Sequence, residues 1–393
     1  MKQKIAYIQN IDHISPIAHG VYIAKVCEAC SDLGLETFLL TPQKPKSKLR
    51  ENMDFWDYYR IKKNTITIKQ LPNIPQRLLK LFFSDKYFLA ESLLLAINSI
   101  VYCLGKKIQI IETSEYEVAW LYSLLYPIIK IRVIYDSHID SPKKIPQFFI
   151  RNIHGIVASS QKYYNFFDNL GMHSKLMLIP NGYDPQIFFN IDKGKTIRKT
   201  LSISEERFVV GYIGRFETLG VEKGISNLIT IGSKAKTKIP LTLLIIGGPQ
   251  KYINKYQKQV LQYGYKSNEC IILPQVSHRD VGKYIGMFDA CWLVYPDTDR
   301  FRYSMSPLKA IEYMASGRPI IASDFPSITQ VLNQRNAYLV KPTDIDSIIN
   351  QLIEIYKQYP HALEKAQQAS VDVLQYTWKL RQKNILQQLK LLN

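Results

Sequence analysis

The feature that most constrains the fold is a regular alternation of short apolar runs and amphipathic segments along a chain of 393 residues. Parallel strands joined by crossover helices give this pattern, because strands buried on both faces read as continuous apolar runs. Near the start, KIAYIQN and ETFLLT are predicted strands on either side of a helix over 20–33. Further strands are predicted at IQIIE, RVIYDSH, GIVASS, RFVVGYIGR, TLLIIGG, CIILPQ, DACWLVYP and RPIIASD. The sequence therefore predicts two similar α/β halves.

Two doubly wound domains are expected, since a single hydrophobic core seldom grows to this chain length. The N-terminal domain is predicted over 1–190 and includes an insert over 43–107 that is rich in basic and aromatic residues. The polar, basic stretch 191–205 is predicted to be a linker, or a surface helix beside it, and the C-terminal domain is predicted over 206–375. The tail 376–393 is predicted to be a helix, a candidate for packing back on the N-terminal domain. In such folds ligands bind at the carboxyl ends of the strands.

Charge and composition limit the classes of partner. The chain has 51 Lys+Arg against 33 Asp+Glu, a net charge of +18, while 46% of its residues are hydrophobic. A disordered polycation is excluded, and the charge favours nucleic acid, an anionic membrane or phosphorylated small molecules. Five scattered cysteines and no secretory pattern favour a reducing cytoplasm. The longest apolar stretch, 93–104, is too short to span a bilayer as a helix, so no transmembrane segment is predicted.

The segment GYIGRFETLGVEKG joins a predicted strand to a loop. Arg215 follows Gly214 at the strand end, and Lys223 comes eight residues after the arginine. Two cations beside a flexible loop suit a diphosphate whose negative charge must be neutralised. An ordinary solvated loop with surface charges fits the spacing equally well.

The segment SMSPLKAIEYMASGRPIIASD has the pattern of a helix start. Ser306 and Pro307 are predicted to cap the helix, leaving the backbone N–H groups of its first turn, around Leu308, to meet an anion. Lys309 and Glu312 lie three residues apart on one helical face. They suit phosphate and a ribose diol respectively, or they form an ordinary ion pair.

Taken in order, GYIGR with its following lysine, LLIIGG, FDACWLVYP and SPLKAIEYMASGRPIIASD resemble the C-terminal half of the retaining glycosyltransferases of family 4. That family has the GT-B fold, two Rossmann-like doubly wound α/β domains facing a cleft. In the N-terminal half, AHGVYIAKVCEACSDLGLETFLLT, IYDSH and IPNGYDPQIF resemble the family's opening glycine loop, histidine strand and hinge segment. The resemblance covers nearly the whole chain apart from about 42–107.

The resemblance implies roles for particular residues. Arg215 and Lys223 match the positions that bind the donor diphosphate and stabilise the departing nucleotide. Glu312 matches the second of a pair of glutamates and holds the donor ribose. Gly20 matches the loop whose backbone N–H approaches the phosphate. His138 matches a histidine near the transferred sugar, although a lone histidine at a strand end is more often a packed residue.

The sequence departs from the family pattern at some positions. Eight residues before Glu312 the family usually has another glutamate, whereas this chain has Ser304. Asp297 and Asp299 have a spacing that could bind a divalent ion, but their place after WLVYP favours a loop. No metal and no cofactor are expected. Glu115 and Glu117 suit either the acceptor edge or a helix start.

The expected activity is that of a retaining, metal-independent hexosyltransferase. It would move a sugar from a nucleotide-diphosphate sugar to a glycan or lipid-linked acceptor, in bacterial surface-polysaccharide (capsule, lipopolysaccharide or exopolysaccharide) biosynthesis. Two alternatives stay open: a non-catalytic sugar-nucleotide-binding scaffold, which Ser304 favours, and a GT-B epimerase or phosphorylase.

The insert 43–107 has a local net charge of +8 with interleaved aromatic residues. This composition suits an anionic membrane surface, or a packed domain with a solvated outer face. Nucleic acid is not expected, because no recognised nucleic-acid module is present. The expected location is the cytoplasm, with the inner face of the cytoplasmic membrane as a candidate docking surface.

Overall fold

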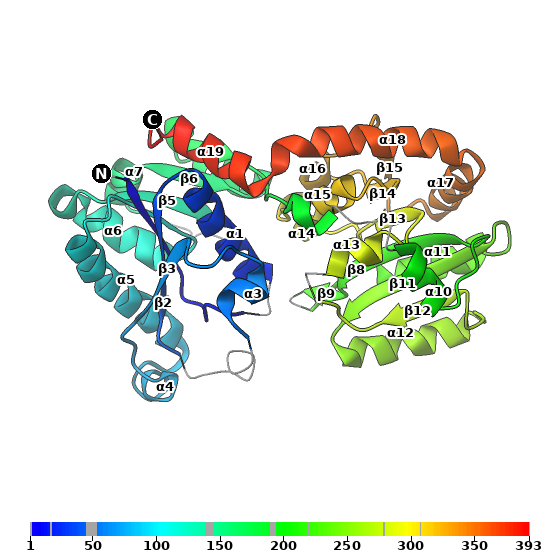
Figure 1. The fold of residues 1–393 in the computed structure, drawn as a ribbon, viewed down its shortest axis with the longest axis horizontal. Helices are drawn as coiled ribbons and strands as arrows, with labels where there is room; N and C mark the ends of the chain where they lie inside the picture. The colour runs from blue at the N-terminus through cyan, green and yellow to red at the C-terminus, as the bar shows by residue number, and fades with distance from the viewer. Residues whose placement is uncertain are drawn as a thin grey trace. The chain divides into compact units, whose positions relative to one another are not determined.

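The computed structural model describes residues 2–15, 18–44, 53–137, 145–188, 194–218, 220–277, 280–306 and 308–392. The chain forms two compact units (Figure 1). Unit 1 comprises 1–181 and 378–393, and unit 2 comprises 182–377. The domain boundary thus falls at Asn181 instead of residue 190, and the C-terminal segment belongs to unit 1.

Unit 1 is built on a seven-stranded parallel sheet in the order β3-β2-β1-β4-β5-β6-β7. Because β1 has β2 on one side and β4 on the other, the strand order reverses between β1 and β4, and ligands bind at such switch points. The strands are β1 (Lys4–Ile8), β2 (Glu36–Pro42), β3 (Ile66–Leu71), β4 (Ile110–Thr113), β5 (Arg132–Ser137), β6 (Gly155–Ala158) and β7 (Leu176–Leu178).

Helices cover both faces of this sheet (Figure 1). Successive strand residues point to opposite faces. Accordingly Ile5 packs in one core with α1 and α19, whereas Ala6 packs in another with α5 and α6. The helices of unit 1 are α1 (Ala18–Asp32), α3 (Phe55–Tyr59), α4 (Gln76–Phe83), α5 (Tyr87–Lys106), α6 (Tyr116–Ile129), α7 (Gln147–Asn152), α8 (Gln161–Asp168) and α19 (Trp378–Gln388), with single 3₁₀ turns η1 (Ser84–Lys86) and η2 (His173–Lys175).

Unit 2 repeats this plan with a six-stranded parallel sheet in the order β12-β11-β8-β13-β14-β15. Its strand order reverses between β8 and β13. The strands are β8 (Phe208–Arg215), β11 (Leu241–Gly248), β12 (Cys270–Leu273), β13 (Ala290–Leu293), β14 (Ile320–Ser323) and β15 (Tyr338–Val340), with a separate antiparallel pair β9 (Glu217–Thr218) and β10 (Val221–Glu222).

Two hydrophobic cores also flank the sheet of unit 2. Val210 packs with α11, α12 and α17, and Val209 packs with α13, α15 and α16 on the other face. The helices are α9 (Pro185–Phe188), α10 (Gly194–Thr200), α11 (Ile225–Ala235), α12 (Gln250–Gln262), α13 (Val281–Ile285), α14 (Asp299–Tyr303), α15 (Leu308–Ala315), α16 (Pro326–Thr329), α17 (Ile345–Lys357) and α18 (Tyr359–Asp372), with the 3₁₀ turn η5 (Val373–Tyr376). The prediction of two doubly wound α/β halves is confirmed.

Two segments predicted from their composition contain regular secondary structure. The insert 43–107 supplies β3, which pairs in parallel with β2, and α5, which packs on the sheet, so it is an integral part of unit 1. The stretch 191–205, predicted to be a linker or a surface helix, contains α10, which is attached to unit 2. Arg198 on α10 donates through Nε to Met287 O at 2.7 Å and pairs with Asp289 at 2.8 Å.

Within the described residues, one helical segment is long and apolar enough to cross a membrane by length and composition. It runs over Gln76–Lys106 through α4, η1 and α5. The prediction from the sequence, limited to 93–104, underestimated this apolar segment. The face of α5 that carries Leu95, Ala96 and Ile100 is buried in the core of unit 1, and a core helix passes the same test.

Candidate functional site

The candidate site lies at the switch point of unit 2, where β8 ends between β11 and β13. In the parallel register Gly214 pairs with Gly247 and Arg215 with Gly248. Gly214 has φ +151°, and a β-carbon at Gly247 would overlap the carbonyl oxygen of Gly214. Only glycine fits this close backbone approach, so Gly214 and Gly247 place no side chain at the strand ends, where a ligand binds in such folds.

A short hairpin explains how Arg215 and Lys223 come together. Strands β9 and β10 pair Glu217 with Glu222, so the chain reverses directly after Arg215. Lys223 N–H then donates to Phe216 O at 2.9 Å, beside Arg215. The eight-residue spacing seen in the sequence therefore places the two cations next to each other.

The turn after Lys223 is packed against the neighbouring strand. Gly224 has φ +82°, and a β-carbon there would overlap the carbonyl oxygen of Val294, the residue directly after β13. Only glycine fits this turn without displacing the end of β13. Lys223 is thereby fixed at the reversal between β8 and β13.

Helix α15 brings a third cation to the same place. The Cε atom of Lys309 lies 3.4 Å from the position that a β-carbon on Gly214 would occupy. Lys309 Nζ pairs with Glu312 Oε2 at 2.6 Å, one turn along α15. Tyr313, fully buried on the same helix, fixes α15 to the sheet by accepting a hydrogen bond from Ile213 N–H at 3.2 Å.

The start of α15 carries a buried hydroxyl. Ser306 Oγ is buried and has no hydrogen-bond partner among the residues that the structure describes. A buried unpaired hydroxyl costs free energy, and a ligand oxygen could satisfy it. The Leu308 N–H, predicted to be available to an anion, instead donates to Ser306 O at 2.9 Å.

The charges around Lys223 have a clear electrostatic effect. Burial and, to a lesser extent, the nearby cations Lys309, Arg215 and Arg300 together lower the pKa of Lys223 to about 8. Positive charge is thus concentrated at the end of β8, and a bound anion would relieve it. Sequence reasoning missed Arg300, because the five-residue helix α14 that carries it is too short to show a periodic pattern.

Glu312, the predicted ribose-binding acid, lies one turn after Lys309 on α15. Its side chain is 5% exposed and paired with Lys309. Glu312 also helps raise the pKa of the Tyr295 phenol, whose main cause is burial. Arg215, Lys223, Gly214, Ser306, Leu308, Lys309 and Glu312 therefore gather in unit 2. Pro307 and His138 lie outside the described residues.

Gly20 does not lie in a loop. It lies inside α1, and a β-carbon there would be 2.6 Å from the hydroxyl oxygen of Tyr59 on α3. That hydroxyl accepts a hydrogen bond from Ser15 N–H at 2.8 Å. The glycine makes room for Tyr59, which the sequence could not indicate because α3 lies in the part outside the resemblance.

The switch point of unit 1 carries a buried acid. Glu115, two residues after the end of β4, accepts hydrogen bonds from Gln9 Nε2 and, at 3.1 Å, from Asn10 N–H, the two residues that follow β1. Burial raises the pKa of the Glu115 carboxyl to about 7. Glu115 lies directly before α6, as the helix-start interpretation expects, whereas its place at the acceptor edge stays a prediction.

The Asp297–Asp299 segment forms a helix start. Asp297 accepts a hydrogen bond from Arg302 Nη2 at 2.6 Å, and Thr298 Oγ1 accepts one from Phe301 N–H at 3.4 Å to cap α14. Among the described residues no group of three or more His, Cys, Asp or Glu side chains could hold a metal ion.

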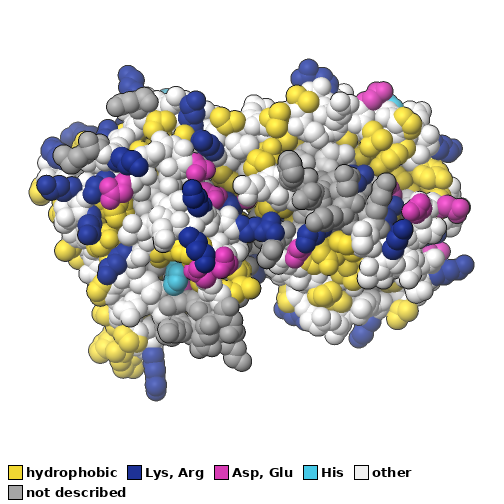
Figure 2. All heavy atoms as spheres, in the orientation of Figure 1, with side chains coloured by type: hydrophobic (Ala, Val, Ile, Leu, Met, Phe, Trp, Pro, Cys, Tyr) yellow, Lys and Arg dark blue, Asp and Glu magenta, His cyan; other side chains and the backbone are white. Residues whose placement is uncertain are grey.

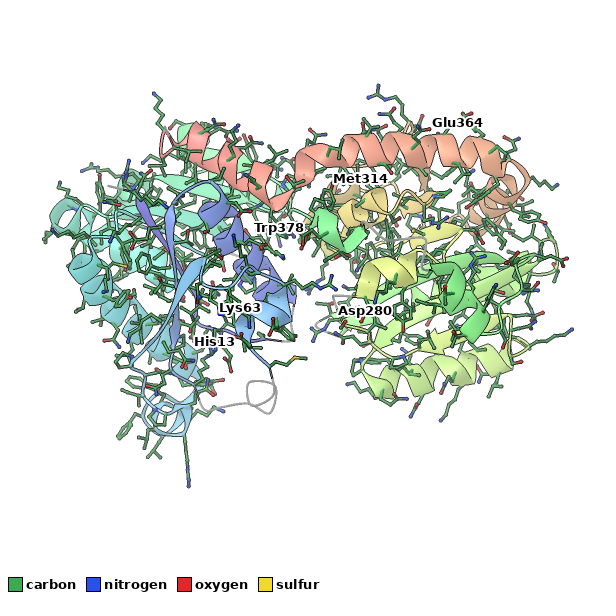
Figure 3. The ribbon with its side chains drawn as sticks, viewed as in Figure 1. His13, Lys63, Asp280, Met314, Glu364 and Trp378 are labelled. Atoms are coloured by element: carbon green, nitrogen blue, oxygen red, sulfur yellow. The ribbon has the colours of Figure 1, made fainter. Side chains whose placement is uncertain are left out.

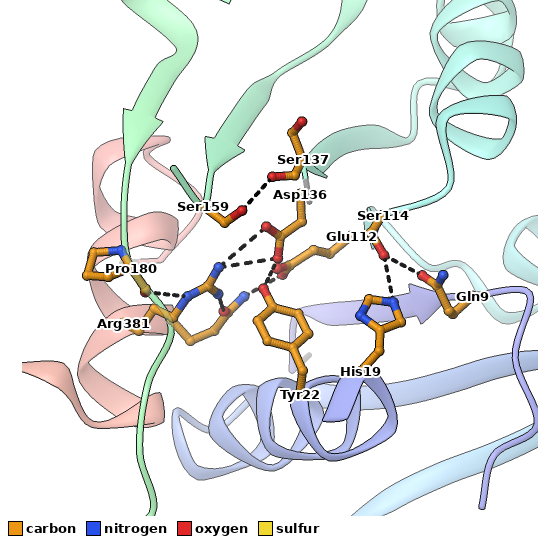
Figure 4. Close-up of polar contacts among 11 residues, drawn as sticks. Gln9, His19, Tyr22, Glu112, Ser114, Asp136, Ser137, Ser159, Pro180 and Arg381 are labelled. Carbon is orange, nitrogen blue, oxygen red and sulfur yellow. Dashed lines mark hydrogen bonds and ion pairs between the residues drawn. The ribbon is translucent and has the colours of Figure 1, made fainter. Parts of the chain in front are cut away.

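A buried polar network attaches the C-terminal helix to unit 1 (Figure 4). Arg381 on α19 bonds Asp136 at the end of β5 at 3.3 Å, and its Nε donates to Pro180 O at 3.1 Å. Tyr22 on α1 donates to the same carboxylate. Trp378, labelled at the start of α19 in Figure 3, packs edge-on against Tyr22 with ring centroids 5.3 Å apart. Sequence reasoning did not find this network, whose members are far apart in the chain.

Comparison with known families finds a match over unit 2. Residues 194–370 match the family described as glycosyl transferases group 1, a stretch that lies within unit 2. The chitobiosyldiphosphodolichol beta-mannosyltransferase of Debaryomyces hansenii is 23% identical over 153 residues, which cover 37% of this chain. The match spans only 32% of that enzyme's own length. These matches support a glycosyltransferase family.

Solved structures share the fold along nearly the whole chain. Anabaena Alr3699/HepE, crystallised with UDP and glucose, superposes with a TM-score of 0.71 at 16% identity and 99% coverage of both chains. Sucrose-phosphate synthase from Thermosynechococcus elongatus gives a TM-score of 0.68 at 18% identity, with 98% of both chains covered. The GT-B class predicted for the two α/β domains is confirmed.

Proposed function

We propose that the protein is a retaining, metal-independent glycosyltransferase that uses a nucleotide-diphosphate sugar as its donor. Unit 2 binds the donor, and the acceptor is a hydroxyl of a glycan or a lipid-linked sugar. One observation carries the proposal: Arg215, Lys223 and Lys309 lie close together at the end of β8, and Ser306, just before α15, has a buried hydroxyl without a partner among the described residues. The family match over unit 2 and the UDP bound by Anabaena Alr3699/HepE support it.

In the proposed donor complex, the diphosphate lies over the glycines at the ends of β8 and β11. Arg215 and Lys223 contact its oxygens, and Glu312 accepts hydrogen bonds from the ribose hydroxyls. As the bond between the sugar C1 and the phosphate oxygen breaks, these cations neutralise the charge that develops on the leaving nucleoside diphosphate. The acceptor oxygen bonds to C1 on the same face, and its proton passes to the departing phosphate oxygen. The anomeric configuration is thereby retained.

The proposed acceptor side is the switch point of unit 1. Gln9, Asn10 and Glu115 present amide and carboxyl groups there, which are suited to sugar hydroxyls. The family resemblance supports a place in the assembly of bacterial surface polysaccharide, in the cytoplasm, where nucleotide sugars are available.

The test is a panel of nucleotide sugars. A donor that binds well should raise the melting temperature, and that donor should then release nucleoside diphosphate in the presence of a suitable acceptor. The anomeric proton coupling in the product reports retention or inversion. Excess chelator should leave the rate unchanged; loss of activity that Mn²⁺ restores would contradict metal independence.

A second function is favoured by Ser304, which stands where the family usually has a sugar-binding glutamate and here ends α14. Such a chain could bind sugar nucleotides without transferring the sugar. Donor turnover would exclude this scaffold, whereas thermal stabilisation without turnover would support it.

A GT-B epimerase or phosphorylase would instead turn over donor without acceptor or require phosphate.

A further inference from the structure

The segment from α4 to the start of α5 exposes a group of large apolar side chains. Leu81 is 76% exposed and Phe82 is 75% exposed, which is unusual for neighbouring residues of this size. We call this group the α4 tip surface; its members are Leu78, Leu81, Phe82, Phe83, Phe88 and Leu89. Figure 2 shows a hydrophobic cluster at the end of unit 1 where Figure 1 places α4.

The rest of the segment is fixed, so these side chains cannot turn into the core. Leu79 is the buried residue of α4, and Leu95 and Ala96 bury the opposite face of α5 in unit 1. Glu91, fully buried on α5, accepts hydrogen bonds from Asn73 Nδ2 at 2.8 Å and from Gln76 Nε2 at 3.3 Å. These bonds fix the base of α4 to α5 and leave the tip projecting.

Positive charge surrounds the tip. Arg77, Lys80 and Lys86 are exposed on α4 and η1, and the acids in the same segment are Asp85 and the buried Glu91. Lys80 Nζ lies 4.9 Å from the centre of the Tyr87 ring. Figure 2 shows a Lys or Arg side chain extending beyond the hydrophobic cluster. Apolar and aromatic side chains bordered by cations match the interface of an anionic bilayer.

We propose that the α4 tip surface inserts into the interface of an anionic membrane and holds the enzyme there. The proposal is independent of the donor chemistry of unit 2, and it favours a lipid-linked acceptor. Insertion is shallow, because the core of unit 1 needs the buried face of α5. A helix crossing the bilayer would have to remove Leu95, Ala96 and Ile100 from that core.

The experiment is flotation of the purified full chain with lipid vesicles, without donor or acceptor. Vesicles of phosphatidylcholine mixed with phosphatidylglycerol should carry the protein, and pure phosphatidylcholine should carry less. The double variant L81S/F82S should lower the partition coefficient about tenfold or more, since burying a single large apolar side chain in the membrane already raises that coefficient about tenfold. Both residues are exposed, so folding should be unchanged by circular dichroism.

The matched control is L261S. Leu261 on α12 is 75% exposed, like Leu81, but lies in unit 2 outside the tip, so its substitution should leave flotation unchanged. K80E/K86E should weaken binding to the mixed vesicles, and the weakening should disappear at high salt.

Four results would overturn the proposal. The first is wild-type protein that does not float with mixed vesicles, and the second is an equal loss in L261S. The third is self-association that L81S/F82S abolishes without vesicle binding, which would assign the surface to a second copy of the chain. The fourth is resistance to alkaline carbonate extraction, which would indicate a spanning helix. Donor-induced thermal stabilisation, measured on the same samples, tests the proposed function separately.

Discussion

Replacing Lys223 by methionine should stabilise the ligand-free protein while abolishing its response to a diphosphate. Lys223 is half-buried beside three other cations, and its pKa falls from the ordinary 10.5 to about 8. A pKa shift of that size means that folding with Lys223 charged costs about 3 kcal/mol. Solvent reaches part of the side chain, so about 1 to 2 kcal/mol is expected. Methionine keeps the length of the side chain and removes the charge.

The pH dependence gives this prediction its sign. Below pH 8 Lys223 is charged in both the folded and the unfolded chain, so the full cost is present. Between pH 8 and 10.5 the folded state loses the proton first and the unfolded chain binds more protons, so wild-type stability rises with pH. The advantage of K223M should therefore be largest below pH 8 and should decrease as pH approaches 10.5.

The assay is urea unfolding of both proteins at neutral and at alkaline pH. K258M, which removes an exposed lysine from α12, reports the general effect of losing one positive charge. Adding UDP should stabilise wild type and K258M but not K223M. The reasoning is refuted if K223M is no more stable than wild type at neutral pH, or if its advantage does not change with pH.

Two further substitutions separate binding from folding. S306A should leave the free energy of unfolding within about 0.5 kcal/mol of wild type, because the hydroxyl has no described protein partner. It should weaken UDP binding about fivefold in calorimetry, for the loss of one hydrogen bond; unchanged affinity would place the diphosphate elsewhere. R381M leaves the fully buried Asp136 without its cation and should cost about 3 kcal/mol in urea unfolding. K379M, on the exposed face of α19, should cost little. Equal losses of unfolding free energy in R381M and K379M would show that the ion pair of Arg381 with Asp136 does not stabilise unit 1.

The repeated βα pattern was predictable because buried parallel strands are continuously apolar. KIAYIQN, ETFLLT and RFVVGYIGR all form central strands. Strand β3 was missed because its residues alternate in burial at the sheet edge and carry Thr, Lys and Gln. The basic composition around α10 fits a linker and a surface helix equally, because composition does not show the contact of Arg198 with Met287 and Asp289.

The site was predictable where its residues belong to one local motif. The spacing of Arg215 and Lys223 is fixed by a hairpin, and that of Lys309 and Glu312 by one helical turn. Contacts between distant segments could not be read from spacing. Arg300 on α14 adds positive charge near Lys223, and Tyr59 on α3 fills the space beside Gly20. Each depends on tertiary packing between elements separated in the chain.

The central claim is that cations at the end of β8 neutralise the leaving nucleoside diphosphate. Its most direct test is the rate of nucleoside diphosphate release at saturating donor and acceptor for wild type, R215A and K223A. Each variant should be slower by a factor of about a hundred or more, with K258A as a charge-matched control that keeps the wild-type rate. Near-normal rates in both R215A and K223A would contradict the account.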